Sequence, residues 1–143
     1  MINNVSSKVN PVRAAVGDVA RNVDMCVPAT HSGAASIIET DIPQAGGGCE
    51  TVQQLGPLQV DAILLHAKDL SMFIKVDAEG FDERIVSALR NLKVWSAVQW
   101  IYFETKNAAE RNDLLESLSK EGFVEQYRTN TDRSSCDILV SKL

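Results

Sequence analysis

Residues 73–84 form the stretch that most restricts how this chain can fold. A short apolar and β-prone run, Phe-Ile-Lys-Val, is followed by Asp77, Glu79 and Gly80, and a helical pattern begins directly afterwards. In an open α/β sheet, ligands bind beyond the carboxyl ends of the strands, where a strand gives way to a helix. Asp77 and Glu79 are therefore the first candidates for catalytic or binding carboxylates.

The residues that follow continue a strand–helix order. Apolar residues recur at three- and four-residue spacing over 81–92, which predicts a helix. Asp82 and Glu83 fall in its first turn, where we expect them to satisfy free N–H groups. The run 97–104 is continuously apolar, as buried parallel strands are, and it ends in Glu104.

The C-terminal region adds a capping-box pattern at 107–110, which begins a helix that Gly122 ends. The whole order predicts an α/β fold whose sheet is mostly parallel, with an antiparallel hairpin at its C-terminal edge. The predicted strands of this region are 71–76, 97–104, 123–127 and 136–141.

The first 70 residues carry weaker signals. A β-prone segment over 9–18 stops at a Gly-Asp turn, and two short strands over 23–28 and 34–39 are predicted to pair as a hairpin. Three consecutive glycines place 43–48 in a loop, because glycine is costly inside a helix or strand. Asp61 is predicted to cap a short helix that extends to about residue 66.

Composition narrows the function classes. The 143 residues are a usual length for one domain, the net charge is −5 without a basic cluster, and no apolar run approaches the length of a membrane span. We therefore expect neither a nucleic acid nor a membrane as partner, and the cytoplasm as compartment. Cys26, Cys49 and Cys136 are widely spaced, which predicts reduced thiols rather than a disulfide framework or a metal site.

The central stretch resembles a known signature. Ile-Lys-Val-Asp-Ala-Glu-Gly-Phe-Asp at 74–82 is similar to the lysine-hydrophobic-aspartate-x-glutamate-glycine-x-glutamate pattern of FkbM-type methyltransferases. Five other segments resemble that family in the same order along the chain, and they are 14–18, 31–36, 60–63, 101–104 and 118–123.

The resemblance implies a Rossmann-like fold that binds S-adenosyl-L-methionine and transfers its methyl group, usually to the hydroxyl oxygen of a small molecule or sugar. It implies that Asp18 meets the adenine and that Asp77, Glu79 and Gly80 line the methyl-transfer site. We therefore expect Asp77 and Glu79 to be catalytic and Gly80, with Asp18, to bind the cofactor. Glu104 is a candidate for contacting the acceptor, although capping or solvation explains it equally well.

The family's first two strands and its glycine-rich cofactor loop have no counterpart in this sequence, which begins about where the family's third strand does. We expect a single partial domain, with residues 9–70 as a strand, hairpin and loop region and 71–143 as the core. Either the sheet carries half of a methyltransferase site, or the chain is a non-catalytic interaction module that binds no cofactor on its own. Incomplete sheet edges predict self-association or a partner that completes the sheet.

Overall fold

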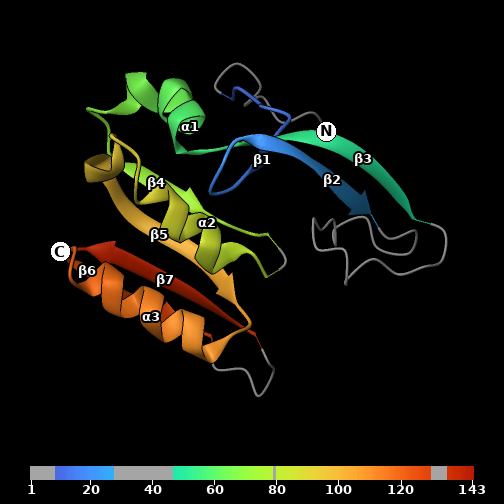
Figure 1. Ribbon diagram of the computed structural model, residues 1–143. Coiled ribbons are helices and arrows are strands. Elements are labelled where there is room, and N and C mark those ends of the chain that lie inside the picture. Colours follow the sequence, from blue (N-terminus) through green and yellow to red (C-terminus); the bar gives the residue numbers. More distant parts are fainter. Residues whose placement is uncertain (1–8, 28–46, 79, 130–134) are drawn as a thin grey trace, which may run out of the picture.

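The computed structural model describes residues 9–27, 47–78, 80–129 and 135–143, and this part of the chain forms two β-sheets and three α-helices (Figure 1). The first sheet has the strand order β1-β3-β2 and the second β4-β5-β7-β6. The strands are β1 (Ala15–Val16), β2 (Arg21–Val27), β3 (Gly48–Leu55), β4 (Met72–Lys75), β5 (Val98–Thr105), β6 (Phe123–Arg128) and β7 (Cys136–Lys142). The α-helices are α1 (Pro57–Leu64), α2 (Asp82–Leu89) and α3 (Ala108–Ser119), and the 3-10 helices are η3 (Leu65–Ala67) and η4 (Trp95–Ala97).

The second sheet and the two α-helices that pack on it follow the order of strands and helices predicted for the C-terminal half. β4 and β5 are parallel and are connected through α2, whereas β7 is antiparallel to both of its neighbours, β5 and β6. Asn107 caps α3 as predicted, because its side-chain oxygen accepts hydrogen bonds from the backbone N–H groups of Ala109 and Glu110. Helix α2 is shorter than predicted, since residues 90–92 form turns after it.

The main core lies between this sheet and its two helices, which cover the same face of the sheet (Figure 1). The strands alternate, so that one side of each strand faces the helices and the other side faces away. On β5, Ile101 and Phe103 are fully buried beneath the helices. Their buried neighbours in this core are Val76, Val86, Val98, Leu114, Leu118, Phe123, Cys136, Ile138 and Val140.

The prediction of a mostly parallel sheet is wrong. Of the five strand pairings, β1 with β3 and β4 with β5 are parallel, while the other three are antiparallel. Both sheets are therefore mixed. The physical reason is that β7 enters between β5 and β6 in the opposite direction, so the predicted hairpin contributes two antiparallel pairings instead of one.

The N-terminal sheet differs from the predicted hairpin. β2 pairs antiparallel with β3 along its whole length, from Arg21 opposite Gln54 to Val27 opposite Gly48. The segment 34–39, predicted to be its partner, lies outside the described residues. β3 was not predicted, because its sequence Gly-Cys-Glu-Thr-Val-Gln-Gln-Leu has little apolar alternation. The predicted strand over 9–18 is reduced to the two residues of β1.

Cys26 and Cys49 form a disulfide, which corrects the prediction that all three thiols are reduced. The two cysteines are directly opposite each other on β2 and β3, and their Cα atoms are 4.0 Å apart. Their sequence separation of 23 gave no sign of this pairing, since only the strand register brings them together. Cys136 is a free, buried thiol in the main core.

Asp61 does not cap a helix. It lies within α1 and is buried, and its carboxylate accepts hydrogen bonds from the backbone N–H groups of Lys93 (2.8 and 3.0 Å) and Val94 (3.4 Å). It thereby holds α1 against the turn that follows α2. Within the ranges that the structure describes, none of the helices has the length and apolar character needed to cross a membrane.

Candidate functional site

The connection from β4 to α2 is organised by one buried carboxylate. Asp82 has no exposed surface, and its two oxygens accept backbone N–H hydrogen bonds from Ala78, Gly80 and Glu104, each at 3.3 Å. Two of these donors belong to the connection itself and the third to β5. Asp82 therefore fixes the shape of the connection and attaches it to the neighbouring strand.

The protonation of Asp82 follows from its position. Burial raises the pKa of this carboxyl, because a charged group is poorly solvated there, and the three backbone donors act in the opposite direction. The sequence predicted Asp82 and Glu83 to serve only the first turn of α2. That prediction was incomplete, because Asp82 also organises the preceding residues and Glu83 accepts a hydrogen bond from the hydroxyl of Thr105 on β5.

Gly80 has the backbone conformation that the connection needs. Its φ is +96°, a value that residues with a Cβ rarely adopt, so glycine is required here by the backbone rather than by crowding. A Cβ at Gly80 would lie 3.8 Å from Lys106, its nearest neighbour, which is an ordinary contact. The adjacent candidate Glu79 lies outside the described residues.

Asp77 lies at the carboxyl end of β4, as predicted, and its side chain is 59% exposed. The ammonium group of Lys75 donates to one of its oxygens at 2.9 Å. The pKa of Lys75 is raised, chiefly by this hydrogen bond and also by the charge of Asp77. Lys75 thus holds the carboxylate of Asp77 at the surface, where an external molecule can reach it.

Glu104 is within β5 rather than at its end, since the strand continues to Thr105. Its carboxylate is half-buried and lies 4.0 Å from the ammonium group of Lys106. Its backbone N–H is one of the three donors to Asp82. Glu104 is therefore connected to the β4–α2 connection through its backbone, while its side chain has a basic partner.

Asp18 and Gly80 border two hollows that adjoin each other. The larger, of about 630 Å³, lies between α2 and α3 and is also lined by Asp18, which follows β1. The smaller, of about 300 Å³, is lined by Gly80, Lys106 and Asn107. Both are lined by Glu83, Arg84 and Glu110, so they form one groove. Two residues assigned to cofactor binding thus share this groove, which we call the α2–α3 groove.

The α2–α3 groove has an acidic lining. Four carboxylates, Asp18, Glu83, Glu110 and Asp113, face it in its larger part together with one guanidinium, that of Arg84. The sequence singled out Glu110 only as part of the capping box at 107–110, and it singled out neither Arg84 nor Asp113, because only helix packing brings these three residues together. A groove of this composition favours a ligand that carries positive charge.

Asp77 borders a different hollow, of about 330 Å³. Its walls are apolar side chains of β1, α1, β4 and α2, and Lys75 and Asp77 are its charged members. The structure therefore does not bring Asp77 into the α2–α3 groove. The apolar lining residues are Val16, Val60, Leu64, Ile74, Val76, Ala78, Ile85, Leu89 and Leu92.

Gly17 explains the position of Asp18. A Cβ at Gly17 would lie 2.3 Å from the side chain of Gln54, which is 1% exposed and donates from its amide group to the carbonyl oxygen of Val19 at 2.8 Å. Only glycine permits this approach. The buried Gln54 therefore braces the turn that carries Asp18 against β3.

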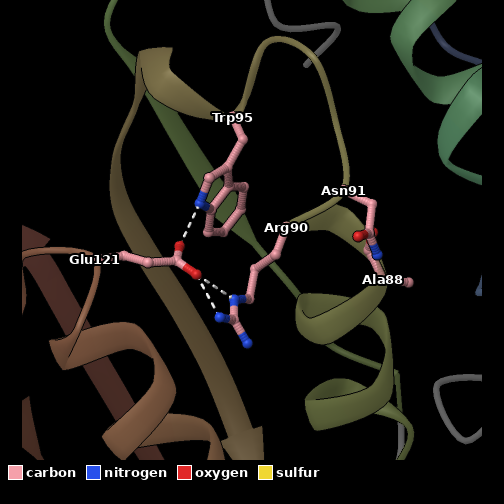
Figure 2. Close-up of polar contacts among 5 residues, drawn as sticks. All are labelled: Ala88, Arg90, Asn91, Trp95 and Glu121. Carbon is pink, nitrogen blue, oxygen red and sulfur yellow. Dashed lines mark hydrogen bonds and ion pairs between the residues drawn. The ribbon is translucent and has the colours of Figure 1, made fainter.

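A polar cluster joins the end of α2 to the end of α3 (Figure 2). Arg90, which caps α2, donates from Nε to Glu121 Oε1 at 2.8 Å, and Trp95 donates from Nε1 to Glu121 Oε2 at 2.6 Å. Glu121 follows the end of α3. Although burial acts to raise the pKa of Glu121, the hydrogen bonds from Arg90 and Trp95 hold it below its ordinary value.

Comparisons with known proteins give no relative for this chain, because no protein-family model, curated protein or solved structure matches it. The resemblance of 74–82 to a methyltransferase signature therefore stays a prediction. Among the described residues, no three His, Cys, Asp or Glu side chains lie close enough together to hold a metal ion.

Proposed function

We propose that the chain takes part in S-adenosyl-L-methionine-dependent methyl transfer to a hydroxyl oxygen of a small molecule. The observation that carries the proposal is the β4–α2 connection. Its signature residues have interlocking roles: Lys75 holds Asp77, Gly80 supplies the turn, and Asp82 fixes the backbone around both. This arrangement presents a carboxylate at the carboxyl end of a parallel strand, which is the usual place for a site in an α/β sheet.

The α2–α3 groove is compatible with the cofactor. S-adenosyl-L-methionine supplies, when bound, a methyl group on a positively charged sulfur, and four carboxylates line the groove. In this proposal Asp18 holds the adenine end and the backbone at Gly80 faces the reactive end. Both assignments follow the family resemblance, and the shared lining of the two hollows supports them.

The role of Asp77 in this proposal is that of a general base, which requires the methyl end of the cofactor to extend from the α2–α3 groove past Gly80 and Ala78 to the separate hollow that Asp77 borders. An acceptor hydroxyl that attacks a methyl carbon must lose its proton, and a carboxylate within hydrogen-bond reach can take it. Asp77 would hold that proton, and S-adenosyl-L-methionine would supply the methyl group that passes from its sulfur to the acceptor oxygen. Glu104 is proposed to orient the acceptor, and Lys75 to position Asp77.

Titration calorimetry with S-adenosyl-L-methionine tests the proposal directly. We expect saturable heat with the wild-type chain and about tenfold weaker binding by Asp18→Asn, because loss of one charge-assisted hydrogen bond is worth about 1.4 kcal/mol or more. Asp69→Asn, an exposed carboxylate outside both hollows, is the matched control. The absence of heat at high micromolar protein would contradict cofactor binding by this chain and leave the interaction-module alternative.

A second experiment addresses Asp77. The wild-type chain and Asp77→Asn are incubated with methyl-labelled cofactor and an extract of hydroxylated small molecules, and label in the products is counted. We expect transfer to fall by about 100-fold or more in the variant, as for loss of a general base, with cofactor binding unchanged. Equal transfer by two equally folded proteins would show that Asp77 is not the base.

A further inference from the structure

The second sheet has one face that no described helix covers. Helices α2 and α3 both pack on the face that carries Ile101 and Phe103, so the alternate side chains of β4, β5, β6 and β7 face away from them. Four of these side chains are large and exposed: Phe73 (59%), Trp100 (44%), Val124 (41%) and Tyr127 (55%). We call this surface the open face.

Strand register places the open-face residues in two rows across the sheet. Phe73 is opposite Trp100, which is opposite Ser141, which is opposite Val124. In the next row, Lys75, Tyr102, Leu139 and Tyr127 are opposite one another in the same way. Phe73 and Trp100 are thus neighbours, and Tyr127 lies on the same surface at its other edge, so the exposed aromatic residues extend across all four strands from β4 to β6.

The open face has about the apolar area of one side of a stable interface. Aromatic side chains present about 150–250 Å² each, so the exposed fractions of Phe73, Trp100, Tyr127 and Val124 amount to roughly 400 Å². A standard interface covers about 800 Å² on each partner, of which somewhat more than half is apolar. Tyr102 and Leu139 are half-buried and add to the total.

The width of the open face decides what can cover it. Four strands spaced about 4.8 Å apart extend over about 14 Å, whereas one helix is about 10 Å across with its side chains. A single helix would leave either Phe73 on β4 or Tyr127 on β6 in water. A second sheet of the same width covers both, and sheets pack face to face about 10 Å apart, which leaves room for aromatic side chains.

We propose that the open face is the dimer interface of this protein, with the same face of a second copy as its occupant. The charges of the face do not oppose this. Lys75 already donates to Asp77, and the hydroxyl of Tyr102 donates to Asp137. Burial raises the pKa of Tyr102, and its hydrogen bond with Asp137 raises it further. Glu104, which is opposite Asp137 on the same face, lies 4.0 Å from the ammonium group of Lys106. Each of these charges therefore has a polar partner, which reduces the usual cost of burying charge in an interface.

Sedimentation velocity over about 1–200 µM protein, the range in which micromolar dimers dissociate, tests the interface. We expect the wild type to pass from monomer to dimer in this range and the variant Phe73→Ser/Tyr127→Ser to dimerise at least about 30-fold more weakly, since buried aromatic residues dominate interface energies. The matched control is Leu65→Ser/Leu70→Ser, which removes two equally exposed apolar residues outside the open face. Circular dichroism establishes that each variant is folded.

Two outcomes would overturn the proposal. A wild type that stays monomeric at the highest concentration would mean that no second copy covers the face, so that a different partner would have to be sought. Equal weakening by the control pair would locate the interface elsewhere. As a confirming measurement that needs no substitution, hydrogen exchange should slow across β4 to β6 as the dimer forms, because the open face of these strands becomes covered.

Discussion

Removal of the Asp82 carboxylate should destabilise the whole β4–α2 connection. The substitution Asp82→Ala leaves the N–H groups of Ala78, Gly80 and Glu104 without their acceptor. The N–H groups of Ala78 and Gly80 are partly exposed and can hydrogen-bond to water, so the loss of each acceptor lowers the free energy of unfolding by about 0.5–1 kcal/mol. The N–H group of Glu104 lies in a sheet strand, and the loss of its acceptor lowers it by about 1–2 kcal/mol. We expect a total loss of about 3 kcal/mol in the free energy of unfolding.

Urea unfolding of the wild type, Asp82→Ala and Asp82→Asn at neutral pH measures this loss. Asn keeps one acceptor oxygen, so its loss should be about half that of Ala, roughly 1.5 kcal/mol. Asp113→Ala, an exposed carboxylate on α3, is the control and should change stability by less than about 0.5 kcal/mol. A loss below about 1 kcal/mol for Asp82→Ala would refute the argument that this carboxylate holds the connection.

The pH dependence provides an independent test. Because the pKa of Asp82 is raised in the folded protein, the folded state binds more protons than the unfolded state between the ordinary Asp value, about 3.9, and the raised value. Stability from this group is therefore present below about pH 3.9 and is lost as pH rises through the folded pKa. The difference in the free energy of unfolding between the wild type and Asp82→Asn should therefore shrink as pH rises through that range.

Three further predictions concern other parts of the fold. Glu121→Gln should lower the free energy of unfolding by about 1 kcal/mol at neutral pH, because Gln loses the charge that Arg90 and Trp95 bind. Since the pKa of Glu121 is lowered in the folded protein, this difference should disappear as pH falls below about 4.3 and through the folded pKa. Urea unfolding at a series of acid pH values measures it. Asn107→Ala should lower the free energy of unfolding by about 1 kcal/mol, because it removes the cap of α3. Asn112→Ala, within the same helix, removes no cap and should not lower it in this way. The double variant Cys26→Ser/Cys49→Ser should lose about 3 kcal/mol, from the loop entropy for a separation of 23, and a reducing agent should affect only the wild type. Unchanged melting of the wild type after reduction would contradict that value.

The C-terminal half of the fold was predictable because its signals are local and periodic. The apolar spacing of α2, the cap at Asn107 and the apolar run of β5 each specify an element without help from elsewhere in the chain. The insertion of β7 between β5 and β6 was not predictable in this way, since strand order depends on packing between distant segments.

The N-terminal half shows the limit of such reasoning. β3 has a glutamine pair and an exposed first half, and its identity as a strand comes from its pairing with β2. The disulfide was missed for the same reason, because a register, not a spacing, brings Cys26 to Cys49.

For the site, position was easier to predict than role. Asp77 is at a strand end, as the sequence indicated, but the residue that organises the connection is Asp82. Two features of the sequence point to Asp82: it is a carboxylate two residues after a glycine, and it lies at the start of a predicted helix. Complete burial of a carboxylate cannot be inferred from either, since Asp is seldom fully buried.

The hydrogen bond from the backbone N–H of Glu104 to Asp82 also stabilises the register of β4 and β5. The pairing of β4 with β5 shifts between Met72 and Phe73, so the strands alone do not hold a regular register. A slip of one residue would move the Glu104 N–H about 3.3 Å along the strand, beyond reach of Asp82. The misaligned sheet would then bury a carboxylate without one of its partners, which is costly. Asp82 therefore stabilises the native register of β4 and β5 relative to a register shifted by one residue.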